Sequence, residues 1–418
     1  MMPLPEYAFT RCSTRKAVRK VRLHVQGWIE MNPILRTIAA VLPLGLPILL
    51  AASLIEYGRA QATQEIGGQK VVTLARKATG NTKPEFTSVT VLPGRGMQLL
   101  QITANFPGKG NVDVLASPDF AASKKMLDQD DNANGDLAYR LGSAFLVPYP
   151  NRIRGKLSAD GKTLTTEWEG HTITLPANNI GKNPGAERHA MHGLILKAKT
   201  DNVAVKDIPG GQQVTGVIHA GDFGGHWLSK TDLDFTVSLT ADAVDAVVVA
   251  KNVGTEAEPI AIGWHPYFNL PSGDRTQVRI QIPASNLAEV DNYDNVFPTG
   301  KINPVDGTQY DLRASGGVPL AKNFYDDNWS KLDWKNGVVT TKVIDPAAKY
   351  GVAIEGVSPE IRTIQMYAPP TAKFVAIEDQ FNFAEPFSKI WGSMNTGMVT
   401  LKPGQSTKWH VRLKVFVP

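Results

Sequence analysis

The sequence predicts an all-β protein built as one large antiparallel β-sandwich. Two observations predict this class: short runs in which apolar and polar residues alternate, and dense turn residues between those runs. No stretch after residue 62 shows three or more turns of helical periodicity, and no linker or sequence repeat divides residues 63–418. A strand with one apolar face must bury that face against another layer. We therefore expect a single domain made of two large packed sheets.

Three segments show the alternation most clearly. The runs 233–240, 278–282 and 409–417 each place apolar residues at every second position. Successive side chains of a strand point to opposite faces, so each run can present one apolar face to a shared core. Glycine, proline and serine cluster at 209–211 and 315–317, where we expect tight turns.

The first 62 residues differ in character from the rest. Residues 37–55 carry no charge and are mostly Leu, Ile, Ala and Val; Arg36 precedes them, and Ala60-Gln61-Ala62 follows. This layout is typical of a secretory signal peptide, and Met31 is a better start for it than the first methionine. An uncleaved membrane anchor is the alternative, because a spanning helix needs ~20 apolar residues. Two prolines interrupt the run, and we favour cleavage and a periplasmic or secreted protein.

Charge and cysteine content support the same division. Residues 1–62 hold eight Lys and Arg and three Asp and Glu, and subtracting these from 44 and 39 leaves 36 of each in residues 63–418. A neutral mature chain argues against nucleic-acid binding through a broadly basic surface. The single cysteine, Cys12, lies in the leader, so the domain contains no disulfide or cysteine metal site.

The most informative motif is Trp264-His265-Pro266-Tyr267-Phe268. Proline fixes its own φ and pushes the preceding residue toward an extended conformation, so we expect His265 on stiff backbone at the end of a strand. Imidazole titrates near neutrality, which suits a proton donor or acceptor. Taken alone, His265 could equally be a core histidine packed between aromatic rings.

Four further motifs carry polar residues that suit a binding or catalytic site. They are 147–155 with Asn151 and Arg152, 189–193 with His192, 324–328 with Asp326, and 374–380 with Glu378. Arginine presents a fork of hydrogen-bond donors. Glu378 directly follows four apolar residues, so we expect a strand to carry it to a pocket. Each residue also has a purely structural interpretation; aspartate, for example, is a common turn former.

The five motifs, in this order, resemble the pattern of the aldose 1-epimerases of the galactose mutarotase superfamily over roughly residues 99–418. The resemblance implies the family's β-supersandwich and an isomerase that interconverts the α and β anomers of a free aldose without a cofactor. It implies that Glu378, ionised near neutral pH, takes the proton from the C1 hydroxyl, and that protonated His265 donates to the ring oxygen. It also implies a set of sugar-binding residues: Arg152, His192, Asp326 and Asn151.

Two other classes of function stay open. A non-catalytic carbohydrate-binding protein could use the same scaffold, because fold does not fix function. A glycoside hydrolase or lyase would need a second carboxylate beside Glu378, for which Asp326 is a candidate. In all three classes the expected partner is a small-molecule sugar, with no nucleic acid and no membrane after signal cleavage.

Two patterns suggest a metal site only weakly. The segment Asp130-Asp131-Asn132-Ala133-Asn134-Gly135 matches the start of a calcium loop, but the twelfth position, where the loop needs glutamate, is Leu141. His189 and His192 have His-x-x-His spacing but lack the helix and glutamate of a zinc site. We interpret the first pattern as a polar turn and expect no bound metal.

We predict that the exported protein begins at or near Thr63, because Ala60-Gln61-Ala62 has the small-x-small form that signal peptidases cleave. N-terminal sequencing of protein from the native host measures this directly. A membrane-bound product that retains residues 37–55 would show that the leader is an anchor.

Overall fold

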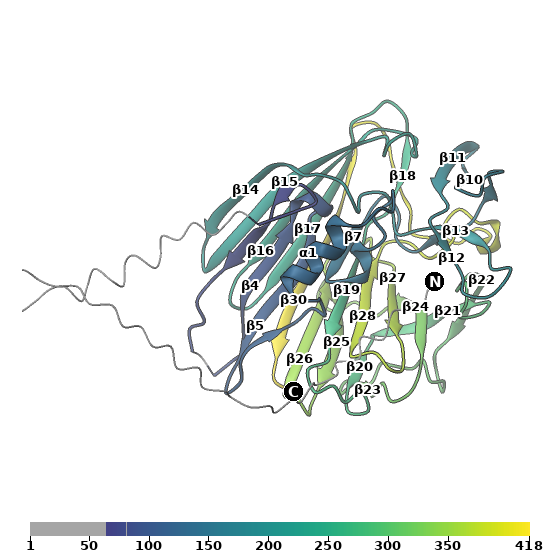
Figure 1. Ribbon diagram of the computed structural model, residues 1–418. Helices are drawn as coiled ribbons and strands as arrows, with labels where there is room; N and C mark the ends of the chain where they lie inside the picture. Colours follow the sequence, from purple (N-terminus) through teal and green to yellow (C-terminus); the bar gives the residue numbers. More distant parts are fainter. Residues whose placement is uncertain (1–63, 81) are drawn as a thin grey trace, which may run out of the picture. The chain divides into compact units, whose positions relative to one another are not determined.

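Antiparallel strands form most of the regular structure in the computed structural model, which describes residues 64–80 and 82–418 (Figure 1). The predicted leader, with Cys12 and the alternative start Met31, lies outside these residues. Within the described ranges, no helix has the length and apolar character needed to cross a bilayer.

The larger of the two main sheets has eleven strands in the spatial order β22-β21-β24-β27-β28-β19-β7-β5-β4-β3, with β6 paired to β5. In that order the strands are β22 (Pro298–Pro304), β21 (Ala284–Val290), β24 (Tyr325–Leu332), β27 (Thr363–Ala368), β28 (Phe374–Gln380), β19 (Gly263–Asn269), β7 (Ser143–Leu146), β5 (Gln98–Phe106), β4 (Glu85–Leu92), β3 (Val72–Ala75) and β6 (Gly110–Asp113).

The second main sheet has nine strands in the order β14-β15-β16-β17-β30-β26-β25-β20-β23. In that order they are β14 (Asp201–Ile208), β15 (Gly211–Gly221), β16 (Thr231–Leu239), β17 (Val244–Asn252), β30 (Ser406–Phe416), β26 (Tyr350–Gly356), β25 (Val339–Asp345), β20 (Arg279–Gln281) and β23 (Val318–Pro319).

Small sheets and short helices complete the described part of the chain. The small sheets contain β1 (Glu65–Ile66) with β2 (Gln69–Lys70), β9 (Lys156–Leu157) with β10 (Thr163–Trp168) and β11 (His171–Pro176), β8 (Arg152–Ile153) with β12 (Asn179–Ile180) and β13 (Arg188–Met191), and β18 (Glu258–Ile260) with β29 (Val399–Leu401). The helices are η2 (Pro93–Arg95), α1 (Phe120–Asp128), η3 (Ala138–Arg140) and η4 (Lys389–Trp391).

The predicted all-β class is confirmed, and the three alternating runs fall in β16, β20 and β30. The predicted turns at 209–211 and 315–317 are also found: each lies just before or at the start of a strand, β15 at Gly211 and β23 at Val318. Helix α1 was not predicted from periodicity. It is nine residues long, and the Asp119 side chain caps it by accepting a hydrogen bond from the backbone N–H of Ala122 at 2.8 Å.

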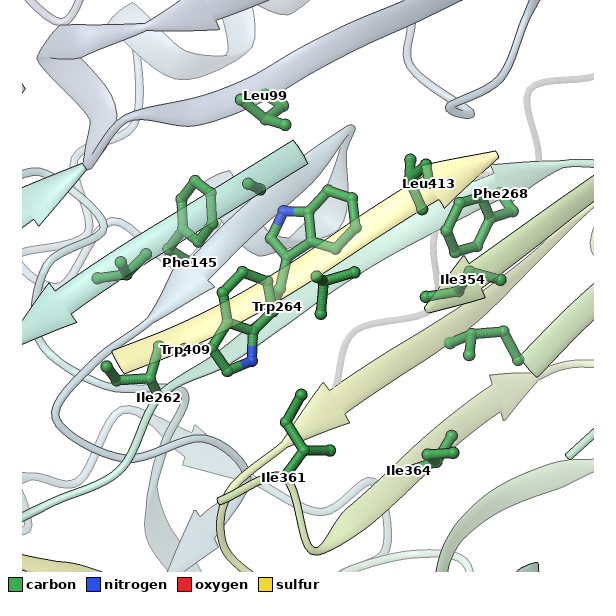
Figure 2. Close-up of a cluster of buried hydrophobic side chains, with 14 of the residues drawn as sticks. Leu99, Phe145, Ile262, Trp264, Phe268, Ile354, Ile361, Ile364, Trp409 and Leu413 are labelled. Atoms are coloured by element: carbon green, nitrogen blue, oxygen red, sulfur yellow. The ribbon is translucent and has the colours of Figure 1, made fainter. Parts of the chain in front are cut away.

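The main core lies between the two large sheets, where aromatic side chains from both meet (Figure 2). Trp264 of β19 and Phe145 of β7 come from the eleven-stranded sheet, and Trp409 of β30 comes from the nine-stranded sheet. The ring centroid of Trp409 lies 6.2 Å from that of Trp264 and 5.9 Å from that of Phe145. Edge-on aromatic packing of this kind adds to the large apolar area that each ring buries.

The strand period connects this core to the opposite face of the eleven-stranded sheet. Trp264 is fully buried in the core, so the next residue, His265, points to the other face. In β28 the same alternation separates Ile377, a core residue, from Glu378. Packing between the sheets therefore fixes which face carries the polar residues of the five motifs.

Candidate active site

A row of polar side chains crosses the eleven-stranded sheet at one level. Gly263 of β19 pairs with Gln380 of β28, and Tyr267 pairs with Ala376, a register that places His265 opposite Glu378. Glu378 in turn pairs with Gln365 of β27, and Gln365 pairs with Asn328 of β24. Directly opposed residues in an antiparallel pair have Cβ atoms about 5 Å apart. The register of four strands thus brings these side chains together.

His265 lies in the interior of β19, so the expectation that it would stand at a strand end was wrong. Pro266 pairs with Ser143 of β7 on one side, while direct pairing of β19 with β28 is interrupted between Gly263 and Tyr267. Proline has no N–H to donate, which accounts for a gap in the ladder at this point. The gap falls beside the imidazole, where β19 and β28 present His265 and Glu378.

The side chains of His265 and Glu378 are in direct contact. The Nε2 atom of His265 lies 3.3 Å from Oε1 of Glu378. Gln380, two residues further along β28, donates from Nε2 to Oε2 of Glu378 at 2.7 Å. One carboxylate oxygen is therefore held by an amide while the other faces the imidazole. Both residues are buried, with 5% of His265 and 1% of Glu378 exposed.

Burial moves the two pKa values in opposite directions. It raises the pKa of Glu378 well above its usual range, and the negative charge of Asp326 raises it further. Burial lowers the pKa of His265 to about 4, and the positive charge of Arg152 acts in the same direction. Both shifts run against the expectation of an ionised Glu378 facing a protonated His265 in the free site. At neutral pH the imidazole is therefore neutral, and the raised pKa of Glu378 favours the protonated carboxyl group.

His192 reaches the same place from the small sheet of β8, β12 and β13. Its ring centroid lies 5.0 Å from that of His265, nearly perpendicular to it, and Tyr139 of η3 packs against both rings. Burial lowers the pKa of His192 well below its usual range, and the nearby His265 and Arg152 lower it further. His192 is therefore neutral, so one of its ring nitrogens can donate a hydrogen bond and the other can accept one.

The backbone around His192 is held in an uncommon conformation. His192 has a φ of 62°, and its N–H donates to the carbonyl of Asn151 at 3.0 Å. A Cβ on Gly193 would lie 2.4 Å from the carbonyl oxygen of Val147, so the motif requires glycine there. Non-glycine residues with positive φ persist only where the surrounding structure holds them, and they cluster at functional sites.

The remaining predicted residues form one hydrogen-bonded network. Arg152 donates from Nη2 to Oδ2 of Asp326 at 3.2 Å and from Nη1 to Oδ1 of Asn151 at 3.0 Å. Gln365 closes the network: its Nε2 donates to Oδ1 of Asp326 at 2.9 Å, and its Oε1 accepts from both Asn151 and Asn328. All six predicted site residues therefore meet on this face.

A narrow inner pocket adjoins this network. Its polar wall is formed by Asn151, Arg152, Asp326, Asn328 and Gln365, and Trp391 of η4 is part of its apolar wall. Several polar atoms here have no hydrogen-bond partner among the described residues: Nε of Arg152, Nδ1 of His192, Nδ1 of His265 and Oδ1 of Asn328. Buried polar groups are normally paired, so this concentration suits a hydroxyl-rich ligand.

In the two segments that match metal patterns, polar side chains are hydrogen-bonded within the protein. In the segment 130–135, Oδ1 of Asn132 accepts from the backbone N–H groups of Asn134 and Gly135, which is the predicted polar turn. His189 is buried in β13 and hydrogen-bonded to Asn179 at 2.9 Å. Within residues 64–80 and 82–418 no group of three or more His, Cys, Asp or Glu could hold a metal ion.

Sequence reasoning missed four residues of the site: Gln365, Asn328, Gln380 and Tyr139. Gln365 and Gln380 are polar residues within strands whose neighbours are mostly buried, and that pattern is the signal that could have found them. Asn328 lies two residues after Asp326 on the same face of β24, so strand periodicity also indicated it. Tyr139 lies outside the five motifs, and no local pattern connects it to the histidines.

Solved structures that share this fold include galactose mutarotase-like proteins. A galactose mutarotase-like protein from Clostridium acetobutylicum superposes with a TM-score of 0.63 at 20% identity, covering 83% of this chain and 99% of the other. An aldose epimerase homologue from C. elegans superposes with a TM-score of 0.59 at 19% identity, covering 83% and 99%. The predicted supersandwich fold is therefore confirmed.

The chain belongs to the aldose 1-epimerase family, whose sequence pattern matches residues 122–414. The galactose mutarotases of Homo sapiens and Pongo abelii are each 30% identical to it over 105 residues. That alignment spans 24% of this chain and 30% of the length of each relative.

Proposed function

We propose that this protein is an aldose 1-epimerase that opens and recloses the ring of a free aldose, interconverting its α and β anomers. The observation that carries the proposal is the buried contact between His265 and Glu378, 3.3 Å apart on neighbouring strands. Mutarotation needs one group that takes a proton from the C1 hydroxyl and another that gives a proton to the ring oxygen. A shared-proton carboxyl–imidazole pair can supply both.

Glu378 is the proposed base and His265 the proposed acid. The catalytic form, an ionised Glu378 beside a protonated His265, contains the same number of protons as the neutral pair. It is reached when the proton moves across the 3.3 Å contact, without exchange with solvent. The sugar's C1 hydroxyl and ring oxygen then face an ionised base and a charged acid. After the ring opens, rotation about C1–C2 and closure on the other face return both protons.

The polar network holds the sugar while this happens. Neutral His192 lies beside His265 and is the proposed partner of the ring oxygen or C1 oxygen, together with Arg152. Asp326, fixed by Arg152 and Gln365, is the proposed acceptor of other sugar hydroxyls. The inner pocket adjoins this network, whereas His265 and Glu378 do not line it. Bringing C1 to the pair therefore requires a side chain to move, and Tyr139, packed on both imidazole rings, is the candidate.

We predict that Glu378→Gln nearly abolishes mutarotation and changes sugar affinity by no more than a few fold, because the amide keeps the shape and loses the base. Polarimetry of freshly dissolved α-glucose and α-galactose measures the rate, and calorimetric titration measures affinity. A matched control is Glu258→Gln, which alters a buried glutamate of β18 that is bonded to Thr231.

Two results would contradict the proposal. Wild-type protein that binds sugar without accelerating the optical change would be a non-catalytic binding protein. Wild-type protein that releases reducing ends from oligosaccharides would be a hydrolase. Substantial rate in Glu378→Gln would move the base elsewhere, most plausibly to Asp326.

The pKa directions predict a bell-shaped dependence of kcat/KM on pH, which reports the free enzyme. Below about pH 4 the His265 imidazole takes up a second proton while Glu378 remains protonated, so no base is left and the rate falls. On the alkaline side the rate falls when Glu378, whose pKa is raised, loses the only proton of the pair. The acidic limb therefore belongs to the imidazole and the alkaline limb to the carboxyl group.

Histidine variants test this assignment. His265→Asn should remove the acidic limb together with most of the rate, whereas His192→Asn should weaken binding and rate but keep both limbs. His219→Asn, an exposed histidine paired with Asp232, is the control. If His192→Asn erased the acidic limb and His265→Asn kept it, the roles of the two histidines would be reversed.

A further inference from the structure

A second, more open pocket lies beside the inner one. Its walls include Arg154, Thr166, Glu187, Glu385, Phe387 and Ser388. We call it the outer pocket. None of its residues belongs to the proposed catalytic pair or to the network of Arg152 and Asp326.

Two chain segments run from one pocket to the other. Asn151 and Arg152 line the inner pocket, and the next three residues, 153–155, line the outer one. Ala384 likewise lines the inner pocket and Glu385 the outer one. The backbone N–H of Glu385 donates to the carbonyl of Arg152 at 2.7 Å, which joins the two segments. The pockets therefore share a wall, and a ligand in one lies next to the other.

Ionic contacts of Arg154 connect the charged walls of the outer pocket. Arg154 lies between two carboxylates, with Nε 3.5 Å from Oε2 of Glu385 and Nη1 3.9 Å from Oε2 of Glu187. Its guanidinium also stands 4.5 Å from the ring centroid of Phe297. Glu385 is 4% exposed, has a φ of 58° and accepts a hydrogen bond from the backbone N–H of Arg154. An uncommon backbone conformation that is held by several contacts is typical of a ligand-binding or catalytic site.

The lining resembles a site for a neutral, hydroxyl-rich group. Carboxylates, a guanidinium and hydroxyls offer both acceptors and donors, and the half-buried ring of Phe387 offers an apolar surface. Two carboxylates against one guanidinium leave no excess positive charge, so an anionic group such as a phosphate would be repelled rather than held. Gly155 allows this arrangement, because a Cβ there would lie 2.2 Å from the carbonyl oxygen of Thr165 on β10.

We propose that the outer pocket binds the second sugar unit of a reducing oligosaccharide whose first unit occupies the inner pocket. This inference rests on the proposed function and narrows its substrate class to neutral reducing oligosaccharides. The second unit adds contacts to Glu187, Thr166 and Phe387 that a monosaccharide does not make. Reducing disaccharides should accordingly have a higher kcat/KM than glucose, and glucose 6-phosphate a lower one.

Variants of exposed or half-buried pocket residues test the proposal on the whole protein. Thr166→Trp should fill the outer pocket. Glu187→Gln should remove the charge of a carboxylate and keep the size of the pocket. Mutarotation of fresh α-lactose and β-maltose is compared with that of α-glucose by polarimetry. We expect each variant to lose about five-fold or more in kcat/KM for the disaccharides and to stay within two-fold of wild type for glucose. Thr172→Trp on β11 and Glu256→Gln, which line neither pocket, are the matched controls.

The outcomes separate this inference from the proposed function. Suppose that wild-type protein accelerates glucose mutarotation but has no higher kcat/KM for the disaccharides, or that both variants keep the wild-type kcat/KM for the disaccharides. The outer pocket is then no sugar subsite, and the proposed function stands. If no sugar is mutarotated, the proposed function fails, and calorimetric titration with cellobiose decides the inference. Cellobiose binding that is lost in Thr166→Trp supports the subsite, and absence of binding to wild-type protein overturns it.

Discussion

The contact between His265 and Glu378 depends on the pairing register of β19 with β28, and the rest of the site is arranged around that pair. A shift of one residue would turn every side chain of a strand to the opposite face. The register is secured from the other side, where Trp264 packs against Trp409 in the core between the sheets. The aromatic core thus positions the polar face, although it touches none of the reacting groups.

Burial gives this pair its chemistry. In water the carboxyl group and the imidazole would titrate independently, with pKa values of about 4.3 and about 6.5. In the protein, desolvation raises the pKa of Glu378 and lowers that of His265 to about 4, which favours a state in which the two groups hold one proton between them. Because the base and the acid hold one proton between them, they need no proton exchange with solvent between ring opening and ring closure. The charged residues nearby act in the same directions as burial: Asp326 raises the pKa of Glu378, and Arg152 lowers the pKa of His265.

The sequence was sufficient for the fold class and for choosing six residues that the structure brings together on one face, and physical reasons explain where it was not sufficient. Alternation in segments such as 233–240 is local, so β16 could be predicted without knowing its partners. Gln365 and Tyr139 belong to the site only through strand order and the placement of η3, which are long-range properties. The raised pKa of Glu378 could not be predicted from the sequence, because a short motif specifies a neighbour but not the depth of burial. His265 was placed at a strand end because Pro266 breaks a ladder, yet here only one side of the strand loses its bonds.

The protonation state of His265 in the free protein tests the central claim most directly. Nitrogen-15 NMR of histidine-labelled protein, with His265→Asn used to assign the signal, distinguishes a neutral imidazole from an imidazolium by the shifts of its two ring nitrogens. The structure predicts a neutral ring with two distinct nitrogen signals from pH 5 to 7, and conversion to imidazolium only near pH 4. An imidazolium signal at pH 7 would contradict the account, because it would show an ionised Glu378 beside a charged His265 before any sugar binds.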